Sequence, residues 1–450
     1  MRLHRRTRLS QASDFVVEQV DEDRYARATI TTLKGKKAGT PSTGIVLRTP
    51  KELRAFIKFK LTYSTPNIGF IVSQLHNADS TTSVLTGENL VPFLDHPKNA
   101  ISELARNSIM MVEPGTEYPY SDPLKKLKRI LASECVPIPL RRLVRDTITK
   151  KQELEKTDKG RYAEWRTKNY FDFWRSVDST TALRTELLTE TLKKERLAGG
   201  DFGIPGGPLI VDSETLGISA RINDKSKYLW SGRLKCATNL TLDPRTLEND
   251  SLIDDLISYL KNTAPARGES DIVIMKFKNW DLTMPEVRLN QRKGFRYLIN
   301  KIEMLKMETP TRLFVLLEAG YQLYPSMVAG FDVVSTSFTG YDGDSEFGKG
   351  GGWGSFYDPK LMVHIGFNKI HDLGRFCLCE VCEQVTDIAA LTRDYWNFQI
   401  CRPHFGLTVN GMVAEVRKLI AQRAIQDARV RLEKSELSIL KGLIPDAGIA

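Results

Sequence analysis

The sequence predicts an α/β fold: a TIM barrel of eight parallel strands, with a helical insertion and a C-terminal zinc-binding subdomain. Three observations lead to this prediction. Short apolar runs alternate with amphipathic segments, eight of these runs have the length of a strand, and a group of cysteines with a later histidine follows the last run. A chain of 450 residues is long enough for one large barrel that carries insertions.

The expected strands are apolar runs bounded by Gly, Pro or Asp. In chain order they are 43–47, 68–72, 108–112, 208–212, 238–243, 271–277, 312–317 and 331–335. Intervening segments such as 249–261 and 289–306 carry apolar residues at helical spacing. The order is therefore β-α-β-α, which favours parallel strands in a barrel or a doubly wound sheet, and eight is the number of strands in a barrel.

A long, mainly helical stretch at about 120–200 separates the third and fourth expected strands, and we interpret it as an insertion over one barrel face. We divide the chain into a barrel domain, 1–375, and a zinc-binding helical subdomain, 376–450. Within the second, residues 407 to about 440 have the pattern of one or two helices.

Positive charge is concentrated in the insertion. Between Leu124 and Lys168, fourteen Lys or Arg face six Asp or Glu, so this segment carries +8 of the net +10. Such a surface either binds a polyanion through its phosphates or only keeps the protein solvated. Aromatic residues that alternate with the basic ones either form a stacking surface or are the buried face of a helix; they are Tyr162, Trp165, Tyr170, Phe171, Phe173 and Trp174.

The remaining composition is ordinary for a globular protein, with 41% hydrophobic and 27% charged residues. No apolar run is long enough to span a membrane, and the basic start of the chain has no apolar segment after it, so we expect no secretory signal and a cytoplasmic location. Four of the six cysteines lie between 377 and 401, which favours metal binding in a reducing compartment over disulfides.

The cysteine-rich segment predicts a structural zinc site. Cys377, Cys379 and Cys382 follow a C-x-C-x2-C pattern, and His404 supplies a fourth ligand, with Cys401 as an alternative. Zinc prefers four such ligands in a tetrahedron. Because protein ligands would then fill every position, the ion would be structural and the chemistry would take place elsewhere.

The motif Gly330-Phe-Asp332-Val-Val-Ser335, a glycine-rich loop, the C-x-C-x2-C set and His404 together resemble the C-terminal third of the tRNA-guanine transglycosylase superfamily. The resemblance covers about 310–420 and extends weakly back to 205. It implies a zinc-bearing TIM barrel with pentosyltransferase activity, which exchanges guanine in tRNA or DNA for a 7-deazaguanine through a covalent carboxylate intermediate. Such chemistry needs two acids in different environments.

The resemblance assigns catalytic roles to Asp332 and Asp212. Asp332 matches the first aspartate of the family's last-strand motif, but the nucleophilic aspartate falls on Ser335. Either Asp332 itself is the nucleophile, or an acid in the following loop, Asp342 or Asp344, takes that role, or this chain has lost the reaction. Asp212 ends an expected strand where the family keeps a base-recognising aspartate. The alternative is that Asp212 merely caps the next helix.

Three further residues are expected near the base. Ser335, Glu318 and Gly320 would line the substrate pocket, although the segment that starts at Glu318 could instead be the turn before a helix. Glu113 and Asp178 are weaker candidates for the second acid.

The expected partners are nucleic acid, DNA or tRNA, and a 7-deazaguanine base, with no membrane. A homodimer or a heteromeric modification complex is compatible with the sequence. The competing hypothesis, favoured by Ser335, is a non-catalytic zinc-stabilised barrel that binds nucleic acid or partners a catalytic subunit. A barrel hydrolase with the same structural zinc is a third.

Overall fold

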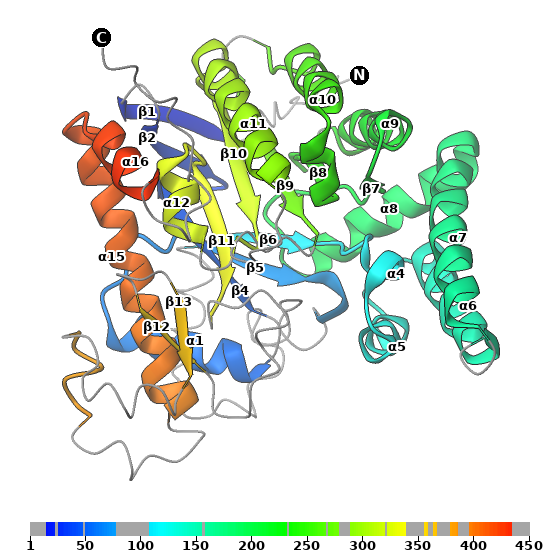
Figure 1. Cartoon of the computed structure of the whole chain (residues 1–450), viewed down its shortest axis with the longest axis horizontal. Coiled ribbons are helices and arrows are strands. Elements are labelled where there is room, and N and C mark those ends of the chain that lie inside the picture. Colours follow the sequence, from blue (N-terminus) through cyan, green and yellow to red (C-terminus); the bar gives the residue numbers. More distant parts are fainter. Residues whose placement is uncertain are drawn as a thin grey trace, which may run out of the picture.

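The fold is seen in a computed structural model (Figure 1). The structure describes residues 15–22, 26–47, 50–77, 108–154, 158–231, 234–266, 269–278, 289–319, 322–338, 355–358, 363–366, 379–385 and 396–433.

An eight-stranded sheet forms the centre of the molecule, and each strand is parallel to its neighbours. The strands are β4 (Ser42–Leu47), β5 (Phe70–Gln74), β6 (Ile109–Glu113), β7 (Leu209–Ile210), β8 (Thr238–Leu242), β9 (Asp271–Phe277), β10 (Arg312–Leu317) and β11 (Val333–Ser337). Each overlaps a predicted run, so the prediction of eight parallel strands is confirmed.

The strand order, β6-β5-β4-β11-β10-β9-β8-β7, is that of a barrel, because neighbours in sequence are neighbours in the sheet and the last strand pairs with the first. Within the described residues, however, no ladder joins β6 to β7. A few backbone hydrogen bonds connect the segment before β7 to both sides. Asp201 N donates to Met110 O (3.0 Å), and Gly203 forms an isolated bridge with Cys236, in which Gly203 N donates to Lys235 O (2.8 Å) and Ala237 N to Gly203 O (2.9 Å). The structure therefore shows a curled sheet with the strand order of a barrel.

A side chain takes the place of the ladder beside β7. The Thr116 hydroxyl donates to Gly207 O (2.7 Å) and accepts from Gly207 N (3.2 Å). A Cβ on Gly206 would lie 2.4 Å from Thr116 Cγ2, so only glycine allows this approach. The Gly-Gly-Pro sequence before β7 thus favours contact with the loop after β6 over strand pairing.

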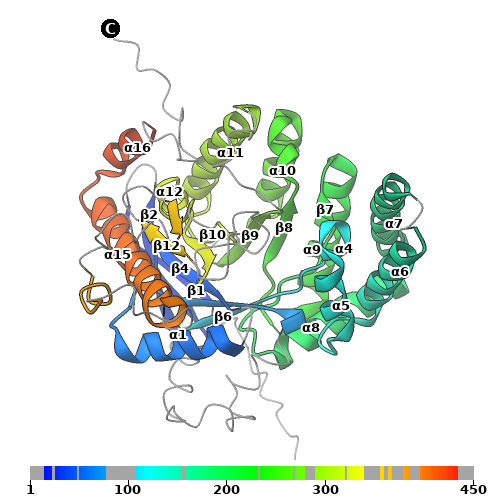
Figure 2. The same cartoon turned by 60° about the horizontal axis from the view of Figure 1, so that its bottom comes forward.

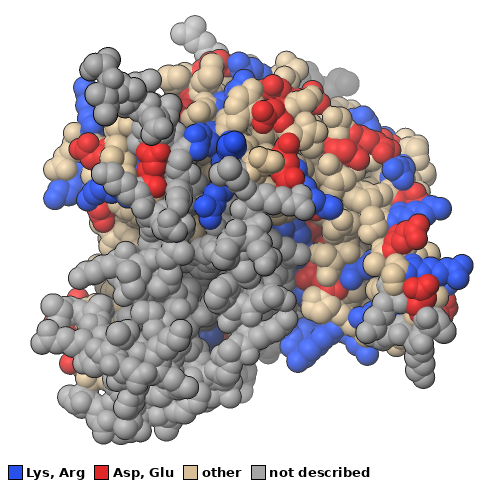
Figure 3. Space-filling view, viewed as in Figure 1, with Lys and Arg blue, Asp and Glu red and all other residues tan. Residues whose placement is uncertain are grey.

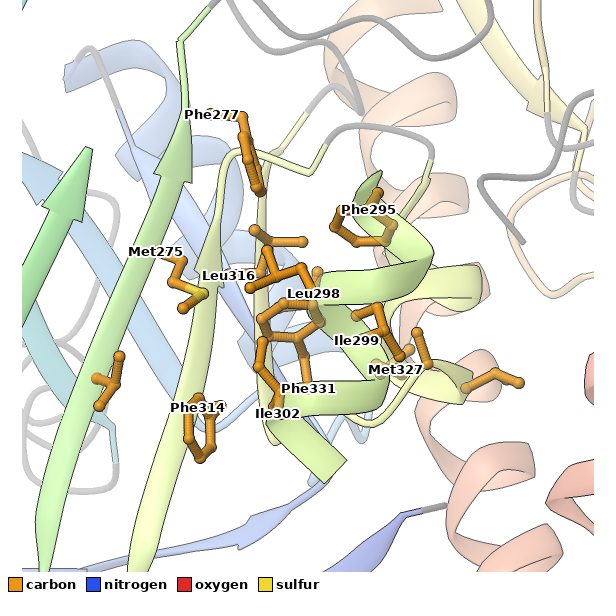
Figure 4. Close-up of a cluster of buried hydrophobic side chains, with 14 of the residues drawn as sticks. Met275, Phe277, Phe295, Leu298, Ile299, Ile302, Phe314, Leu316, Met327 and Phe331 are labelled. Carbon is orange, nitrogen blue, oxygen red and sulfur yellow. The ribbon is translucent and has the colours of Figure 1, made fainter. Parts of the chain in front are cut away.

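The strands are buried on both faces, which explains their continuous apolar runs. In β10, Leu313, Val315 and Leu317 belong to the cluster on the inner face of the curled sheet. Phe314 and Leu316 belong to the outer cluster, where Figure 4 shows them against the helix α11 (Leu289–Glu308). Successive side chains of a strand point to opposite faces, as this division requires.

Helices cover the outer face of the sheet. They are α1 (Pro50–Thr62), α9 (Ser213–Trp230), α10 (Asp250–Asn262), α11, α12 (Leu323–Val328), α15 (Arg402–Ala421) and α16 (Ile425–Glu433). Figure 2 shows α9, α10 and α11 side by side along the outside of the curl. Residues of α15 such as Val409 and Val416 share the outer hydrophobic cluster with the strands, so the C-terminal helices pack directly on the sheet.

The insertion between β6 and β7 consists of helices, as predicted: α4 (Tyr118–Ser121), α5 (Leu124–Ala132), α6 (Ile138–Leu154), α7 (Lys159–Ser179) and α8 (Thr181–Leu197). They pack around a hydrophobic core that they share with β7 and with the helix α9. Tyr170 and Trp174 are fully buried in this core, and Phe171 and Phe173 pack against it. These four aromatics therefore form the buried face of α7 rather than a stacking surface.

The sequence analysis did not predict an antiparallel sheet of β1 (Val16–Glu22), β2 (Arg27–Leu33) and β3 (Lys36–Thr40) at the start of the described chain. Phe15, Val17, Leu33 and Ala38 pack on the inner apolar cluster of the central sheet. Another small antiparallel sheet joins β12 (Ser355–Asp358) to β13 (Val363–Gly366). Among the described helices, none has the length and apolar character needed to cross a bilayer.

Candidate active site and metal centre

A buried lysine surrounded by three glutamates lies at the carboxyl ends of the strands. Lys276 of β9 is 2% exposed and forms ion pairs with Glu113, Glu117 (2.8 Å) and Glu318 (3.0 Å). Glu113 ends β6, Glu117 follows in the next loop, and Glu318 directly follows β10. Functional residues of barrels gather at this end. We call these four residues the carboxylate cluster.

The alternation of the strands directs the cluster into the curl of the sheet. Lys276 lies on the same side of β9 as Ile272 and Ile274, which belong to the inner apolar cluster. Glu113 likewise lies on the same side of β6 as Ile109 and Met111, which also belong to the inner apolar cluster. The interior is therefore apolar over most of its depth and becomes ionic in one layer at the carboxyl end.

The cluster separates the proton affinities of two of its carboxyl groups. Burial raises the pKa of Glu113 to about 7, aided by the charges of Glu318 and Glu117 and opposed by Lys276. Burial alone would also raise the pKa of Glu117, but Lys276 and Lys278 lower it below its usual value. Environments that push the pKa values of neighbouring acids apart are typical of sites that use one as a proton donor and keep another ionised.

Two buried polar atoms beside Lys276 have no hydrogen-bond partner in the described part of the chain. They are the second carboxylate oxygen of Glu113, Oε2, and the hydroxyl of Tyr118. Lys126 Nζ lies 3.9 Å from the centre of the Tyr118 ring. Buried polar groups are almost always paired in proteins, so these atoms are suited to contact a ligand.

Glu318 is held in a strained conformation. Its φ of 56° lies in the left-handed region, which costs a glutamate on the order of 1–3 kcal/mol and is found most often at functional sites. The Glu318 amide donates to Ser335 Oγ (2.9 Å), and Gln74 Nε2 donates to Glu318 Oε1 (3.1 Å). The structure thus places Glu318 beside Ser335, where the resemblance expected a nucleophilic carboxylate.

The expected catalytic role of Asp332 does not fit its position. Asp332 precedes β11 at its amino end, the opposite end from the carboxylate cluster. Its buried carboxylate binds Lys306 Nζ (2.8 Å), Arg27 Nε (3.3 Å) and Phe314 N (2.8 Å). Burial alone would raise the pKa of Asp332, but Arg27 and Lys306 lower it below its usual value, as fits a carboxylate at the centre of a buried ion-pair network.

Asp212 caps a helix. Its Oδ1 accepts from Thr215 N (2.8 Å) at the start of α9, and Thr215 Oγ1 accepts from Asp212 N (3.1 Å), which completes a capping box. Asp178, another candidate acid, forms ion pairs with Arg221 (2.7 Å) and Arg184 (3.7 Å). These contacts account for both residues without a catalytic role.

Other predicted residues lie outside the described chain, namely Gly320, Asp342, Asp344 and Cys377. The sequence analysis missed Lys276 and Glu117. A lysine in the apolar run Asp271–Phe277 was the available signal, because charged residues are rarely buried in such a strand unless they are paired.

A second cluster joins metal-ligating residues at the start of α15. The donor atoms of Cys379, Cys382 and His404 all lie within 4.8 Å of one another, and each sulfur is 3.4 Å from His404 Nδ1. Tetrahedral zinc would separate sulfur and nitrogen by about 3.5 Å, so the donors fit such an ion. Cys401 is not part of this group, and the structure therefore favours His404 over Cys401 as the ligand.

Replacing His404 with Ala should remove bound metal and destabilise the protein, because the binding free energy of a structural ion is part of its folding free energy. We expect less than roughly half the wild-type metal content, measured by elemental analysis, and a lower midpoint of thermal unfolding. Cys401→Ser, at a buried neighbouring cysteine outside the group, is the matched control and should keep its metal. Full metal content in the His404 variant would exclude this ligand set.

Glu113 should also make stability depend on pH. The pKa of a glutamate in an unfolded chain is about 4.3, whereas that of folded Glu113 is about 7. The folded protein therefore binds more protons between these values, and its free energy of unfolding should fall as the pH rises through this window. In Glu113→Gln the decrease between about pH 5 and pH 8 should be smaller, as chemical denaturation can measure. Equal decreases in both proteins would contradict the raised pKa.

Comparison with protein-family models and with curated proteins found no match for this chain. Function must therefore be argued from the site itself.

Proposed function

We propose that the protein is a transglycosylase that exchanges guanine in DNA or tRNA for a 7-deazaguanine through a covalent carboxylate intermediate. The main support is the carboxylate cluster, in which Glu113, whose pKa burial raises to about 7, and Glu318 both contact Lys276 at the carboxyl ends of the strands. The Cys379, Cys382 and His404 group adds support, since it fits the structural zinc that such an enzyme would carry. Closure of the curled sheet into a complete barrel is part of the same proposal.

Glu318 and Glu113 would divide the chemistry between them. The Glu318 carboxylate attacks C1′ of the target nucleotide, the C1′–N9 bond breaks, and its electron pair leaves with guanine, which takes the proton of Glu113. The incoming base then gives its N9 proton to Glu113, and N9 displaces Glu318 from C1′. Charge and protons balance over the two steps, and Glu113 returns to its starting state.

The remaining contacts suit these roles. Lys276 touches both carboxylates, so it stabilises the Glu318 anion before attack and the Glu113 anion after proton transfer. Gln74 and the strained backbone of Glu318 orient the nucleophile. Asp332 and Asp212 have no part in this scheme, because an ion-pair network and a helix cap account for them.

The second candidate function is a non-catalytic barrel that binds nucleic acid or partners a catalytic subunit. Ser335 favours it, because a fully buried serine occupies the position of the expected nucleophile. The two functions differ in whether Glu318 has taken over the role of the nucleophilic aspartate that the resemblance expects at Ser335.

Incubation with radiolabelled guanine and either tRNA or duplex DNA tests the proposal. We expect label to enter one of the two polymers, which identifies the substrate. Glu318→Gln should abolish incorporation, because an amide cannot form the ester intermediate. Ser335→Ala, which removes only a hydroxyl that accepts from the Glu318 amide, should reduce it less. No label in either polymer would support the non-catalytic function.

A further inference from the structure

Helix α5 exposes a row of positive charge without any acid. Its nine residues include four basic and no acidic side chains. Leu127 and Ile130 are buried in the core of the insertion, whereas Lys125, Lys128 and Arg129 are exposed on the opposite face. Within the described residues no ion pair involves these three side chains, and Figure 3 shows Lys and Arg gathered where α5 lies in Figure 1.

Direct contacts connect this helix to the carboxylate cluster. Lys126 on α5 covers the Tyr118 ring, and Lys276 Nζ lies 5.5 Å from the centre of the same ring. Lys278, which follows β9, binds Asp122 at the start of α5 (2.8 Å). Helix α5 is thus linked to the candidate active site through the Tyr118 ring and Asp122.

Arg245 is a further exposed cation near the carboxyl ends of the strands. It follows the carboxyl end of β8, its side chain is 63% exposed, and its Nη2 lies 3.4 Å from the hydroxyl of Tyr120 on α4. Asp243 holds the guanidinium through two short contacts, which orient it. We call Lys125, Lys128 and Arg129 of α5 the basic ridge.

We propose that the basic ridge binds the sugar–phosphate backbone of the polynucleotide whose base enters the carboxylate cluster. This inference rests on the proposed function and specifies where the polymer lies. Phosphodiesters are the fitting ligand because the ridge offers exposed charges in a row and carries no aromatic side chain on which a base could stack. Of the aromatics of α7, Tyr170 and Trp174 are buried in the core of the insertion, and Phe171 and Phe173 pack against it. A row of like charges is unfavourable until a polyanion neutralises it.

The test measures binding alone, by fluorescence anisotropy with labelled tRNA, single-stranded DNA and duplex DNA over a range of salt concentrations. The triple variant K125E/K128E/R129E should bind at least about tenfold more weakly than wild type. The slope of log affinity against log salt should become shallower by about 2, because some three phosphate contacts are lost. The polymer that wild type binds most tightly identifies the source of the phosphates.

A second triple variant, K293E/K418E/R431E, is the matched control. It has the same change in net charge, but its residues are exposed on α11, α15 and α16, away from α5 (Figure 1). It should keep near wild-type affinity, and circular dichroism should show that both variants are folded. Equal losses of affinity in the two variants, or no loss in the α5 variant, would overturn the proposal that the basic ridge binds the backbone.

Failure of the ridge is distinguishable from failure of the proposed function. If wild type exchanges guanine and the α5 variant binds the polynucleotide as tightly as wild type, only the role proposed for the basic ridge is wrong. If the α5 variant alone loses binding but wild type exchanges no base, the ridge stands as a polynucleotide surface and the transglycosylase proposal fails.

Discussion

Replacing Glu113 with Gln should lower the rate of guanine exchange by about 10²- to 10⁴-fold, the usual contribution of a general acid–base residue. Gln keeps the size of the side chain and one oxygen near Lys276, but it cannot give a proton to the leaving base. The burial that raises the pKa of Glu113 to about 7 makes it both a donor and an acceptor near neutral pH. The measurement is initial-rate incorporation of radiolabelled guanine.

Glu195→Gln provides the matched control. Glu195 is another fully buried glutamate whose pKa burial raises well above its usual value, but its carboxylate accepts from Ile204 N and is not part of the carboxylate cluster. This variant should keep most of the exchange rate. The wild-type rate should also vary with pH around 7, and the residual activity of the Glu113 variant should lack that dependence. Equal rates in wild type and the Glu113 variant would remove Glu113 from the mechanism.

Asp332→Asn should destabilise the protein by about 3–5 kcal/mol, the usual cost of removing one partner from a buried ion pair. The Asp332 carboxylate is 0% exposed and pairs with Lys306 and Arg27. In the variant these two cations would stay buried but would lose this negative partner. Urea denaturation measures the change in the free energy of unfolding.

Asp178→Asn is the comparison for this variant. Its ion pair with Arg221 is partly exposed to solvent, at 56% for the Arg221 side chain and 20% for that of Asp178, so its removal should cost much less, about 1 kcal/mol. If Asp332→Asn had wild-type stability and yet no exchange activity, a catalytic role for Asp332 would be restored and its assignment as a structural anchor would be wrong.

The strands could be predicted because each is buried on both faces and reads as a short apolar run. Two features of the fold could not. The N-terminal sheet alternates apolar residues with threonine and lysine, so it lacks such runs. The open ladder beside β7 depends on Thr116 bonding to Gly207, a contact between residues 91 positions apart.

The two candidate sites also differ in how far the sequence predicts them. Cys379, Cys382 and His404 could be predicted because two of the ligands are only three positions apart in the sequence and zinc restricts their spacing. The carboxylate cluster brings Glu113 together with Glu318, and only the sheet unites them. The motif singled out Asp332 but not the end of the strand at which it lies: it precedes β11 and is therefore at the amino end, away from the carboxylate cluster.

The most direct test of the account is to find which side chain becomes bonded to the sugar. Wild-type protein, incubated with its polynucleotide in the absence of a replacement base, is denatured and digested, and the cross-linked peptide is identified by mass spectrometry. The account predicts a single ester at Glu318, which disappears in Glu318→Gln. An ester at Asp212, Asp332, Asp342 or Asp344, or no ester in a protein that exchanges guanine, would contradict it.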